Sequence, residues 1–189
     1  TVLDSIRGRL LTDLASCYMI EGDIREATSQ YLTALDATSK SGDSEAYLTN
    51  CSSLGVAYRR INLPDSALYY YGKGLEAAMK SKDYSAVSNL HANIAVMYIS
   101  FKQLENAKEH AREAITYALK EEDALDWLQA YYICGSLLVK TGEYDQAINY
   151  LHKAYGIASR QQSPRFRLKV LSALLPAFQA TAQDDSVRY

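Results

Sequence analysis

Residues 62–77 read NLPDSALYYYGKGLEA, and their pattern recurs at three other places along the chain. Ala67 has counterparts at a constant interval of 40 residues, and a small residue follows each of them seven positions later. The matching stretches are GDIREATSQYLTALDA at 22–37, KQLENAKEHAREAITY at 102–117 and GEYDQAINYLHKAYGI at 142–157. Self-similarity at a fixed period is the signature of a repeat protein. The sequence therefore predicts four consecutive repeats of one unit.

The other half of each unit carries a second pattern at the same interval. A large or medium apolar residue precedes a small one, as in Leu54 and Gly55, and Tyr58 follows three positions later. The equivalent pairs are Leu14 and Ala15, Ile94 and Ala95, and Cys134 and Gly135. The joints between units carry Asp43, Asp83, Asp123 and Ser163. Such residues accept hydrogen bonds from the free N–H groups of a helix start, so we expect a new helix after each joint.

Each unit divides into two amphipathic helices. Apolar or small residues recur at spacings of three and four in EAYLTNCSSLGVAYRRI (45–61) and in DSALYYYGKGLEAAM (65–79). Gly22, Asn62 and Gly142 suit the backbone conformation that ends a helix, and the chain has only 3 prolines and 9 glycines. A single helix pair cannot bury its apolar stripe, so neighbouring units must stack. The sequence predicts an all-α fold.

Composition excludes several classes of function. The chain has 189 residues, is 48% hydrophobic, and carries 20 basic against 22 acidic residues, for a net charge of −2. This balance gives no electrostatic reason to expect nucleic acid or an anionic membrane as partner. No run approaches the roughly 18 apolar residues that span a bilayer. The chain opens on Thr1, and we expect a piece of a longer protein, with the cytoplasm slightly favoured over a periplasmic sensor domain.

The three adjacent tyrosines at 69–71 and the glycines after them raise two functional alternatives, an aromatic binding patch and a phosphate loop. Successive helical residues lie about 100° apart, so the tyrosines cannot share one pocket. Tyr71 falls at the core position, whereas Tyr69 and Tyr70 fall on flanking or outer surface. Gly72, Gly74 and Ala77 spell G-x-G-x-x-A, but a dinucleotide site needs a preceding strand. We interpret the stretch as structural.

No catalytic set is found in the sequence. His91, His110 and His152 lack a cysteine or carboxylate at metal-ligand spacing, and the three cysteines are expected to be buried small residues. CGSLL at 134–138 lacks the second glycine of a nucleophile elbow. We therefore expect no enzyme activity, no metal and no cofactor.

The repeated columns resemble the tetratricopeptide repeat across residues 8–160. The usual period is about 34 residues, and the longer repeats seen here are similar to those of kinesin light chains and of bacterial peptide-responsive regulators. The resemblance implies a right-handed superhelix of antiparallel helix pairs, forming a single domain over 1–189. Its units would span about 4–43, 44–83, 84–123 and 124–163, with a partial fifth at 164–189.

The resemblance also implies a concave groove lined by the first helix of each unit. The residues carried over to this groove are Asp13, Ser16, Thr49, Ser52, Arg59, Asn89, Asn93, Gln129, Tyr132, Ser136 and Lys169. Asn89 and Asn93 lie one turn apart, and their amides can both donate to and accept from an extended peptide backbone. The basic residues with which chaperone adaptors of this family clamp acidic tails are missing at the equivalent positions.

A fifth first-helix, RFRLKVLSALLPAFQATAQ at 165–183, has no complete partner, and DDSVRY at 184–189 resembles the beginning of one. An uncovered apolar helix favours further repeats or end-to-end pairing of two copies. Our leading hypothesis is a protein- or peptide-binding scaffold or sensor domain of a larger bacterial regulatory protein. The alternatives are a self-association module acting through the terminal helix, and an accessory domain beside a catalytic domain outside this chain.

Overall fold

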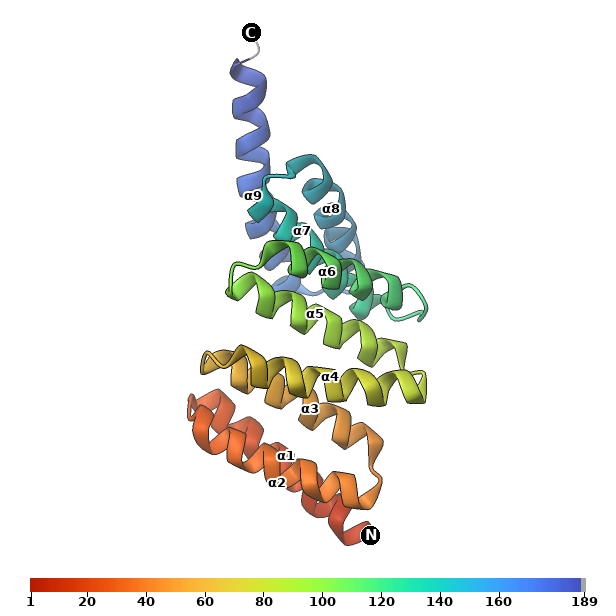
Figure 1. Cartoon of the computed structure of the whole chain (residues 1–189). Coiled ribbons are helices and arrows are strands. Elements are labelled where there is room, and N and C mark those ends of the chain that lie inside the picture. The colour runs from red at the N-terminus through yellow and green to blue at the C-terminus, as the bar shows by residue number, and fades with distance from the viewer. Residues whose placement is uncertain (188–189) are drawn as a thin grey trace. The chain divides into compact units, whose positions relative to one another are not determined.

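The computed structural model describes residues 1–187, with side chains described as far as residue 182, and all regular structure in this part is helical (Figure 1). The helices are α1 (Val2–Glu21), α2 (Ile24–Ser41), α3 (Ser44–Arg60), α4 (Pro64–Ser81), α5 (Tyr84–Ser100), α6 (Leu104–Ala118), α7 (Ala124–Thr141), α8 (Tyr144–Arg160) and α9 (Pro164–Val187). The absence of strands over the described range confirms the all-α prediction.

The chain divides into two compact units, and each is built from helix pairs. The first unit runs from Thr1 to Asn93 and the second from Ile94 onward, so the division falls inside α5. In the first unit α1 packs on α2, α3 packs on α4, and α2 joins the two pairs by packing on α3. In the second unit α6 packs on α7, α7 on α8, and α8 on α9.

The predicted capping of helix starts is confirmed at the joints of Asp43, Asp83 and Asp123. The carboxylate of Asp43 accepts from the backbone N–H of Ala46 at 3.2 Å, and that of Asp83 accepts from Ala86 at 2.9 Å. The carboxylate of Asp123 accepts from the backbone N–H of Leu125 at 2.6 Å and so caps α7. Gly22 and Gly142 take the left-handed conformation after α1 and α7, with φ of 90° and 80°. These caps satisfy free backbone groups at the starts of α3, α5 and α7 and at the ends of α1 and α7, whereas Leu63, Gln103 and Glu143 before α4, α6 and α8 form no side-chain cap bond.

The alanine column forms the core of the helix pairs. Ala27, Ala67, Ala107 and Ala147 are all 0% exposed. In α3, Gly55 leaves the space filled by the ring of Tyr71, because a Cβ at this glycine would overlap that ring. Gly135 likewise leaves space for Leu151, because a Cβ at Gly135 would lie only 2.6 Å from the Cγ of Leu151. Small residues at these positions let paired helices approach closely, as the sequence predicts.

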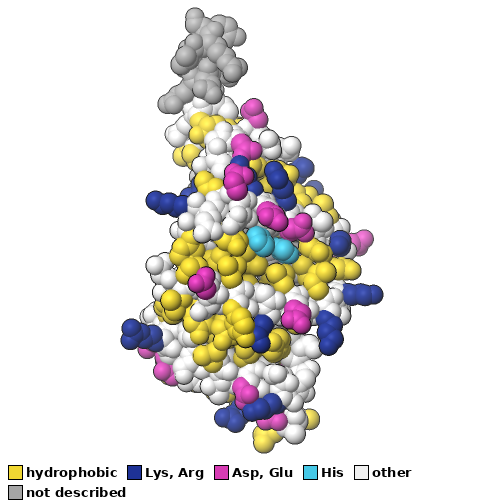
Figure 2. Space-filling model, viewed as in Figure 1, with side chains coloured by type: hydrophobic (Ala, Val, Ile, Leu, Met, Phe, Trp, Pro, Cys, Tyr) yellow, Lys and Arg dark blue, Asp and Glu magenta, His cyan; other side chains and the backbone are white. Residues whose placement is uncertain are grey.

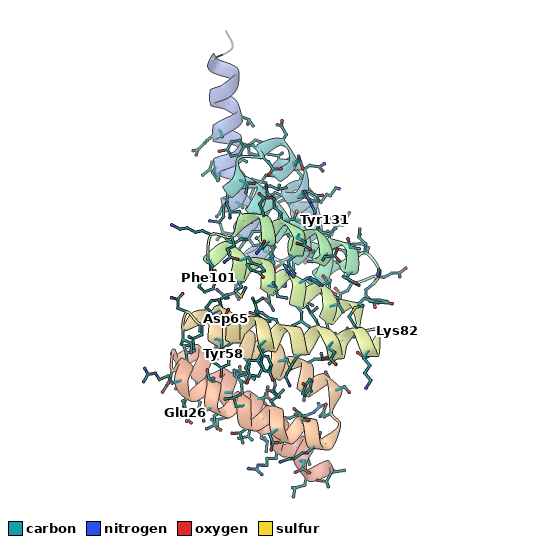
Figure 3. The ribbon with its side chains drawn as sticks, in the orientation of Figure 1. Glu26, Tyr58, Asp65, Lys82, Phe101 and Tyr131 are labelled. Carbon is teal, nitrogen blue, oxygen red and sulfur yellow. The ribbon has the colours of Figure 1, made fainter. Side chains whose placement is uncertain are left out.

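The tyrosine run of α4 serves packing, and the phosphate-loop alternative is excluded by its position inside a helix. Tyr71 is fully buried, whereas Tyr69 is 57% exposed. Tyr70 stacks on Tyr58 of α3 with ring centroids 5.3 Å apart, and Figure 3 shows Tyr58 beside α4. Figure 2 shows apolar side chains gathered on the visible face over α4. Lys73 Nζ lies 5.2 Å from the ring centroid of Tyr69.

Three positions that recur at the 40-residue interval are buried in α3 but exposed in α1. Ala46, Leu54 and Ala57 of α3 are at most 7% exposed. Their counterparts 40 residues earlier are exposed: Ile6, Leu14 and Cys17. The expectation that all three cysteines are buried is therefore wrong for Cys17, because within the described residues no helix precedes α1 and covers these positions.

The other two cysteines are buried as expected. Burial raises the pKa of the Cys51 thiol to about 11, and it does the same for Cys134. A thiol with so high a pKa is protonated and unreactive at neutral pH.

The start of a partner helix predicted at 184–189 is not found where the structure describes this range. α9 continues without interruption to Val187, and residues 188–189 lie outside the described part. Between Pro176 and Val187 the sequence contains neither glycine nor a further proline, so nothing ends the helix before this point.

No helix within residues 1–187 is both long enough and apolar enough to cross a membrane.

Candidate functional site

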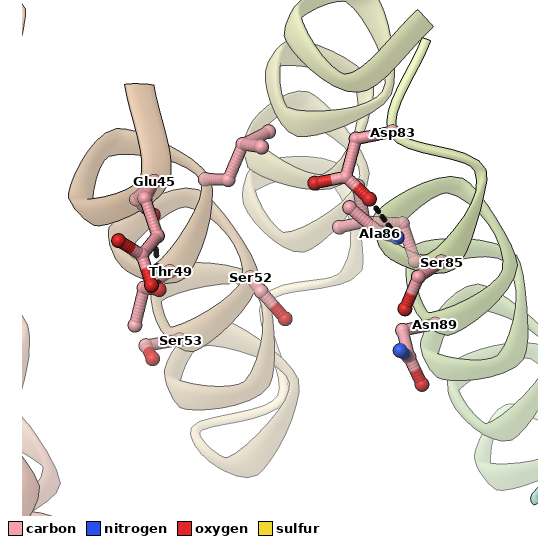
Figure 4. A pocket seen from close by; sticks show the side chains of 10 residues that line it. Glu45, Thr49, Ser52, Ser53, Asp83, Ser85, Ala86 and Asn89 are labelled. Carbon is pink, nitrogen blue, oxygen red and sulfur yellow. Dashed lines mark hydrogen bonds between the residues drawn. The ribbon is translucent and has the colours of Figure 1, made fainter. Parts of the chain in front are cut away.

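The first candidate site is a polar pocket between α3 and the first half of α5, called here the α3–α5 pocket (Figure 4). Its volume is about 350 Å³. Its polar lining consists of Glu45, Thr49, Ser52 and Ser53 on α3 and of Asp83, Ser85 and Asn89 on α5. Leu48, Ala86 and Leu90 complete the wall. The structure thus brings three of the predicted groove residues, Thr49, Ser52 and Asn89, to one pocket.

The two predicted asparagines lie on the α5 side of this surface. Asn89 lines the pocket itself. Asn93, one turn further along α5, donates from Nδ2 to the hydroxyl of Ser52 on α3 at 3.2 Å. This bond fixes the orientation of one pocket residue and leaves the pocket lined by hydroxyl, amide and carboxylate groups. Such groups can hold the backbone of an extended chain from both sides.

A second hollow of about 240 Å³ adjoins the first, between α1 and α3. It is lined by Arg9, Thr12, Asp13, Glu45, Ala46 and Thr49. Since Glu45 and Thr49 line both hollows, one face of α3 forms a wall of each, and the predicted residue Asp13 joins the surface from α1.

An ion pair determines the electrostatics of this surface. Arg9 Nε donates to Asp43 Oδ2 at 2.8 Å, and Arg9 Nη2 donates to Glu45 Oε2 at 3.3 Å. The Ser5 hydroxyl also donates to Asp43 at 2.6 Å. The hydrogen bonds from Arg9 and then from Ser5 hold the pKa of the Asp43 carboxyl well below its usual range. Arg9 therefore offsets much of the negative charge at the edge shared by the two hollows.

Two predicted groove residues of the first unit have other roles. The Ser16 hydroxyl donates to the carbonyl of Thr12 at 2.9 Å and lies 3.0 Å from the hydroxyl of Tyr31. Arg59 lies near the buried hydroxyl of Tyr71, where burial raises the pKa of the phenol to about 12 and the guanidinium opposes this rise. Neither Ser16 nor Arg59 lines the α3–α5 pocket.

The second unit has a pocket of its own, called here the α7–α9 pocket, with a volume of about 280 Å³. Tyr132, Ser136, Val139 and Lys140 line it from α7, and Lys169, Ser172, Ala173 and Pro176 from α9. The predicted residues Tyr132, Ser136 and Lys169 therefore come together here. Gln129, which was predicted to join them, does not line this pocket.

The repeat pattern matches a known family. Tetratricopeptide repeat profiles match residues 7–80, 88–121 and 128–161. The chain belongs to the tetratricopeptide repeat family. No curated protein sequence matches it.

Solved structures share this tetratricopeptide fold at low sequence identity. A putative kinesin light chain of Podospora anserina with nearly identical repeats is 18% identical, with a TM-score of 0.74 over 98% of this chain and 91% of that chain. A Rap protein complexed with Competence and Sporulation Factor is 14% identical, with a TM-score of 0.80 over 95% of this chain and 53% of the other. Aspartyl phosphate phosphatase F from Bacillus subtilis is 14% identical, with a TM-score of 0.81 over 95% of this chain and 50% of the other.

This chain therefore spans about half the length of the Rap protein and of the phosphatase, and it spans 65% of BtubC from P. vanneervenii. The tetratricopeptide fold is a scaffold for protein interactions, and the pockets above lie on the first helices of its repeats, as the resemblance implies.

Two carboxylates of the α3–α5 pocket were not among the residues predicted from the sequence. Asp83 lines the α3–α5 pocket in addition to capping α5. Glu45 lies one helical turn before the predicted residue Thr49, and residues at i and i+4 share a face of a helix. This spacing is the signal that would have identified Glu45.

Proposed function

We propose that this chain is the peptide- or protein-binding sensor or scaffold domain of a larger bacterial regulatory protein, and that an extended peptide binds along the α3–α5 pocket. The observation that carries the proposal is the convergence of Thr49 and Ser52 with Asn89 on one polar pocket, with Asn93 one turn along. The Rap protein solved with Competence and Sporulation Factor supports this reading, since a repeat array of the same fold is found there in complex with a factor.

Site-specific photocrosslinking in cells tests this function. A photoreactive amino acid in place of Ser85, which lines the pocket, is expected to capture a bound chain. The same residue in place of Asn149, an exposed position on α8, serves as the matched control. Asn89→Ala combined with Asn93→Ala should reduce capture at position 85 at least tenfold, because the amide pair is lost. Equal capture at both positions, or capture unaffected by the double substitution, would contradict the proposal.

Self-association through α9 is the second candidate, and an exposed apolar stripe favours it. Leu168, Leu171, Leu175 and Phe178 share one face of α9 and are 45–68% exposed. Two of the positions 40 residues earlier, Leu128 and Leu138 of α7, are at most 4% exposed. We propose that a second copy of the chain covers this stripe of α9.

Sedimentation velocity over a wide concentration range tests this candidate. The mass should rise with concentration, and Leu171→Glu combined with Leu175→Glu should return the chain to a monomer, since each substitution places a charge in the paired face. A monomer at every concentration in the unmodified chain would exclude pairing through α9.

A further inference from the structure

The α7–α9 pocket is basic, whereas the α3–α5 pocket is acidic. Lys140 and Lys169 line it from facing helices, and none of its lining residues is acidic. Both lysines are exposed, and neither forms an ion pair within the described residues. Lys169 Nζ lies 5.2 Å from the ring centroid of Phe166, one turn earlier on α9. In a chain of net charge −2, this pocket is a local site of unneutralised positive charge.

Ser136 supplies an unused hydrogen-bonding group in the same pocket. Many serines and threonines on these helices donate to the carbonyl four residues earlier, as Ser16 does to Thr12 at 2.9 Å. Ser136 occupies the column of Ser16 three repeats later, but its Oγ is buried without a hydrogen-bond partner in the described structure. A buried hydroxyl without a partner is destabilising, because it has lost its hydrogen bonds to water. Because Ser136 is among the residues that line the pocket, an oxygen of a bound molecule is a candidate partner for this hydroxyl.

Pro176 adds an acceptor for a bound backbone. Proline has no N–H, so Pro176 cannot donate to the carbonyl of Ser172, its usual partner four residues earlier in a helix. Both residues line the pocket. The pocket thus combines ammonium and hydroxyl donors with a backbone carbonyl that lacks its helical donor. The ammonium and hydroxyl groups can donate to an anion, and the carbonyl can accept from an N–H. A peptide offers both, because its carboxylates are anions and its backbone carries N–H groups.

We propose that the α7–α9 pocket binds a carboxylate of a peptide ligand, with Lys140 and Lys169 supplying the positive charge and Ser136 a hydrogen bond. The carboxylate comes from an aspartate or glutamate side chain or from the C-terminus, since the chemistry is shared. A volume of about 280 Å³ accommodates one such group and its neighbouring backbone rather than a folded partner. This proposal rests on the peptide-binding function proposed above.

Three synthetic hexapeptides of one alanine–serine sequence test the proposal with the 189-residue chain. All are acetylated; one carries a glutamate and an amidated end, one a glutamine and a free carboxyl end, and one a glutamine and an amidated end. Binding is followed by NMR through the backbone amide signals of Ser136, Lys169 and Ser172. We expect at least one carboxylate peptide to shift these signals and to bind about tenfold more tightly than the neutral peptide, with the affinity falling as salt is added. The stronger of the two carboxylate peptides identifies the source of the anion.

Matched variants distinguish the loss of positive charge from the loss of the folded structure. Lys140→Gln combined with Lys169→Gln should abolish the preference for carboxylate, whereas Lys153→Gln, at an exposed lysine of α8 outside the pocket, should preserve it. Unchanged helical circular dichroism shows that both variants are folded. Equal binding of all three peptides would overturn the carboxylate site while leaving peptide binding intact. Absence of any shift at these amides would also overturn it, whereas the peptide-binding function itself is judged by crosslinking at position 85.

Discussion

At the scale of single residues, two glycines of adjacent helices have opposite roles. Gly55 makes room for the buried ring of Tyr71, whereas a Cβ at Gly72 of α4 would meet no atom within 4 Å. We expect Gly55→Ala to lower the free energy of unfolding by about 1–3 kcal/mol through overpacking. Gly72→Ala should raise it by roughly 0.5–1 kcal/mol, because alanine loses less backbone entropy in a helix. Urea unfolding followed by circular dichroism measures both, and a stabilised Gly55→Ala variant would contradict the close approach of α3 and α4.

At the scale of helices, an ion pair between Arg9 of α1 and Asp43 connects α1 to the start of α3. The pKa of Asp43 is lowered in the fold, mainly by the hydrogen bond from Arg9, whereas the pKa of an unfolded aspartate is about 3.9. The stabilisation is therefore fully present above the unfolded pKa and is lost as the pH falls toward the folded pKa. Asp43→Asn keeps a capping side chain but removes the charge. We expect this variant to be less stable than the parent at pH 7, with the difference shrinking steadily below about pH 4.

A second aspartate provides the control for this pH dependence. Asp36 pairs with Lys40 at 2.6 Å on the surface of α2, and both side chains are 65% exposed. An exposed pair of this kind contributes little to stability. Asp36→Asn should therefore leave the pH profile of unfolding close to that of the parent. A difference between Asp43→Asn and the parent that stays constant from pH 7 to pH 3 would show that the charge of Asp43 does not stabilise the fold.

The helices and their joints could be predicted because each carries its own signal several times over. The alanine of each second helix and the capping aspartates recur at one interval, so every repeat confirms the others. Features that occur once were not predictable. The indole of Trp127 donates to the carbonyls of Ala118 and Glu121, at 2.7 and 3.0 Å, and closes the end of α6 from the next helix. This contact depends on the path of one loop, for which no repeated column gives a signal.

The candidate site was predictable only in part, for a similar physical reason. Periodicity places a residue on a face of a helix, and this was sufficient to bring Thr49, Ser52 and Asn89 to one pocket. It does not determine which side chains on that face already have partners within the fold. Ser16 lies on a predicted face, but its hydroxyl is used by Thr12 and Tyr31. Such pairing follows from side-chain geometry and not from spacing.

At the scale of the whole molecule, a residue's position in the array decides its energetic role even when its repeat column is the same. Leu14 and Leu54 occupy one column in successive repeats, yet Leu14 is 43% exposed and Leu54 is 0% exposed. Leu54 packs in a cluster with Ala27 and Tyr31 of α2, whereas α1 has no preceding pair within the described residues. We expect Leu54→Ala to lower the free energy of unfolding by about 2–5 kcal/mol and Leu14→Ala to lower it by less than about 1 kcal/mol. Chemical denaturation at low protein concentration measures the two values under identical conditions. Similar losses at both positions would mean that another surface covers α1 in solution, and a dependence of the Leu14→Ala effect on protein concentration would identify that surface as a second copy of the chain.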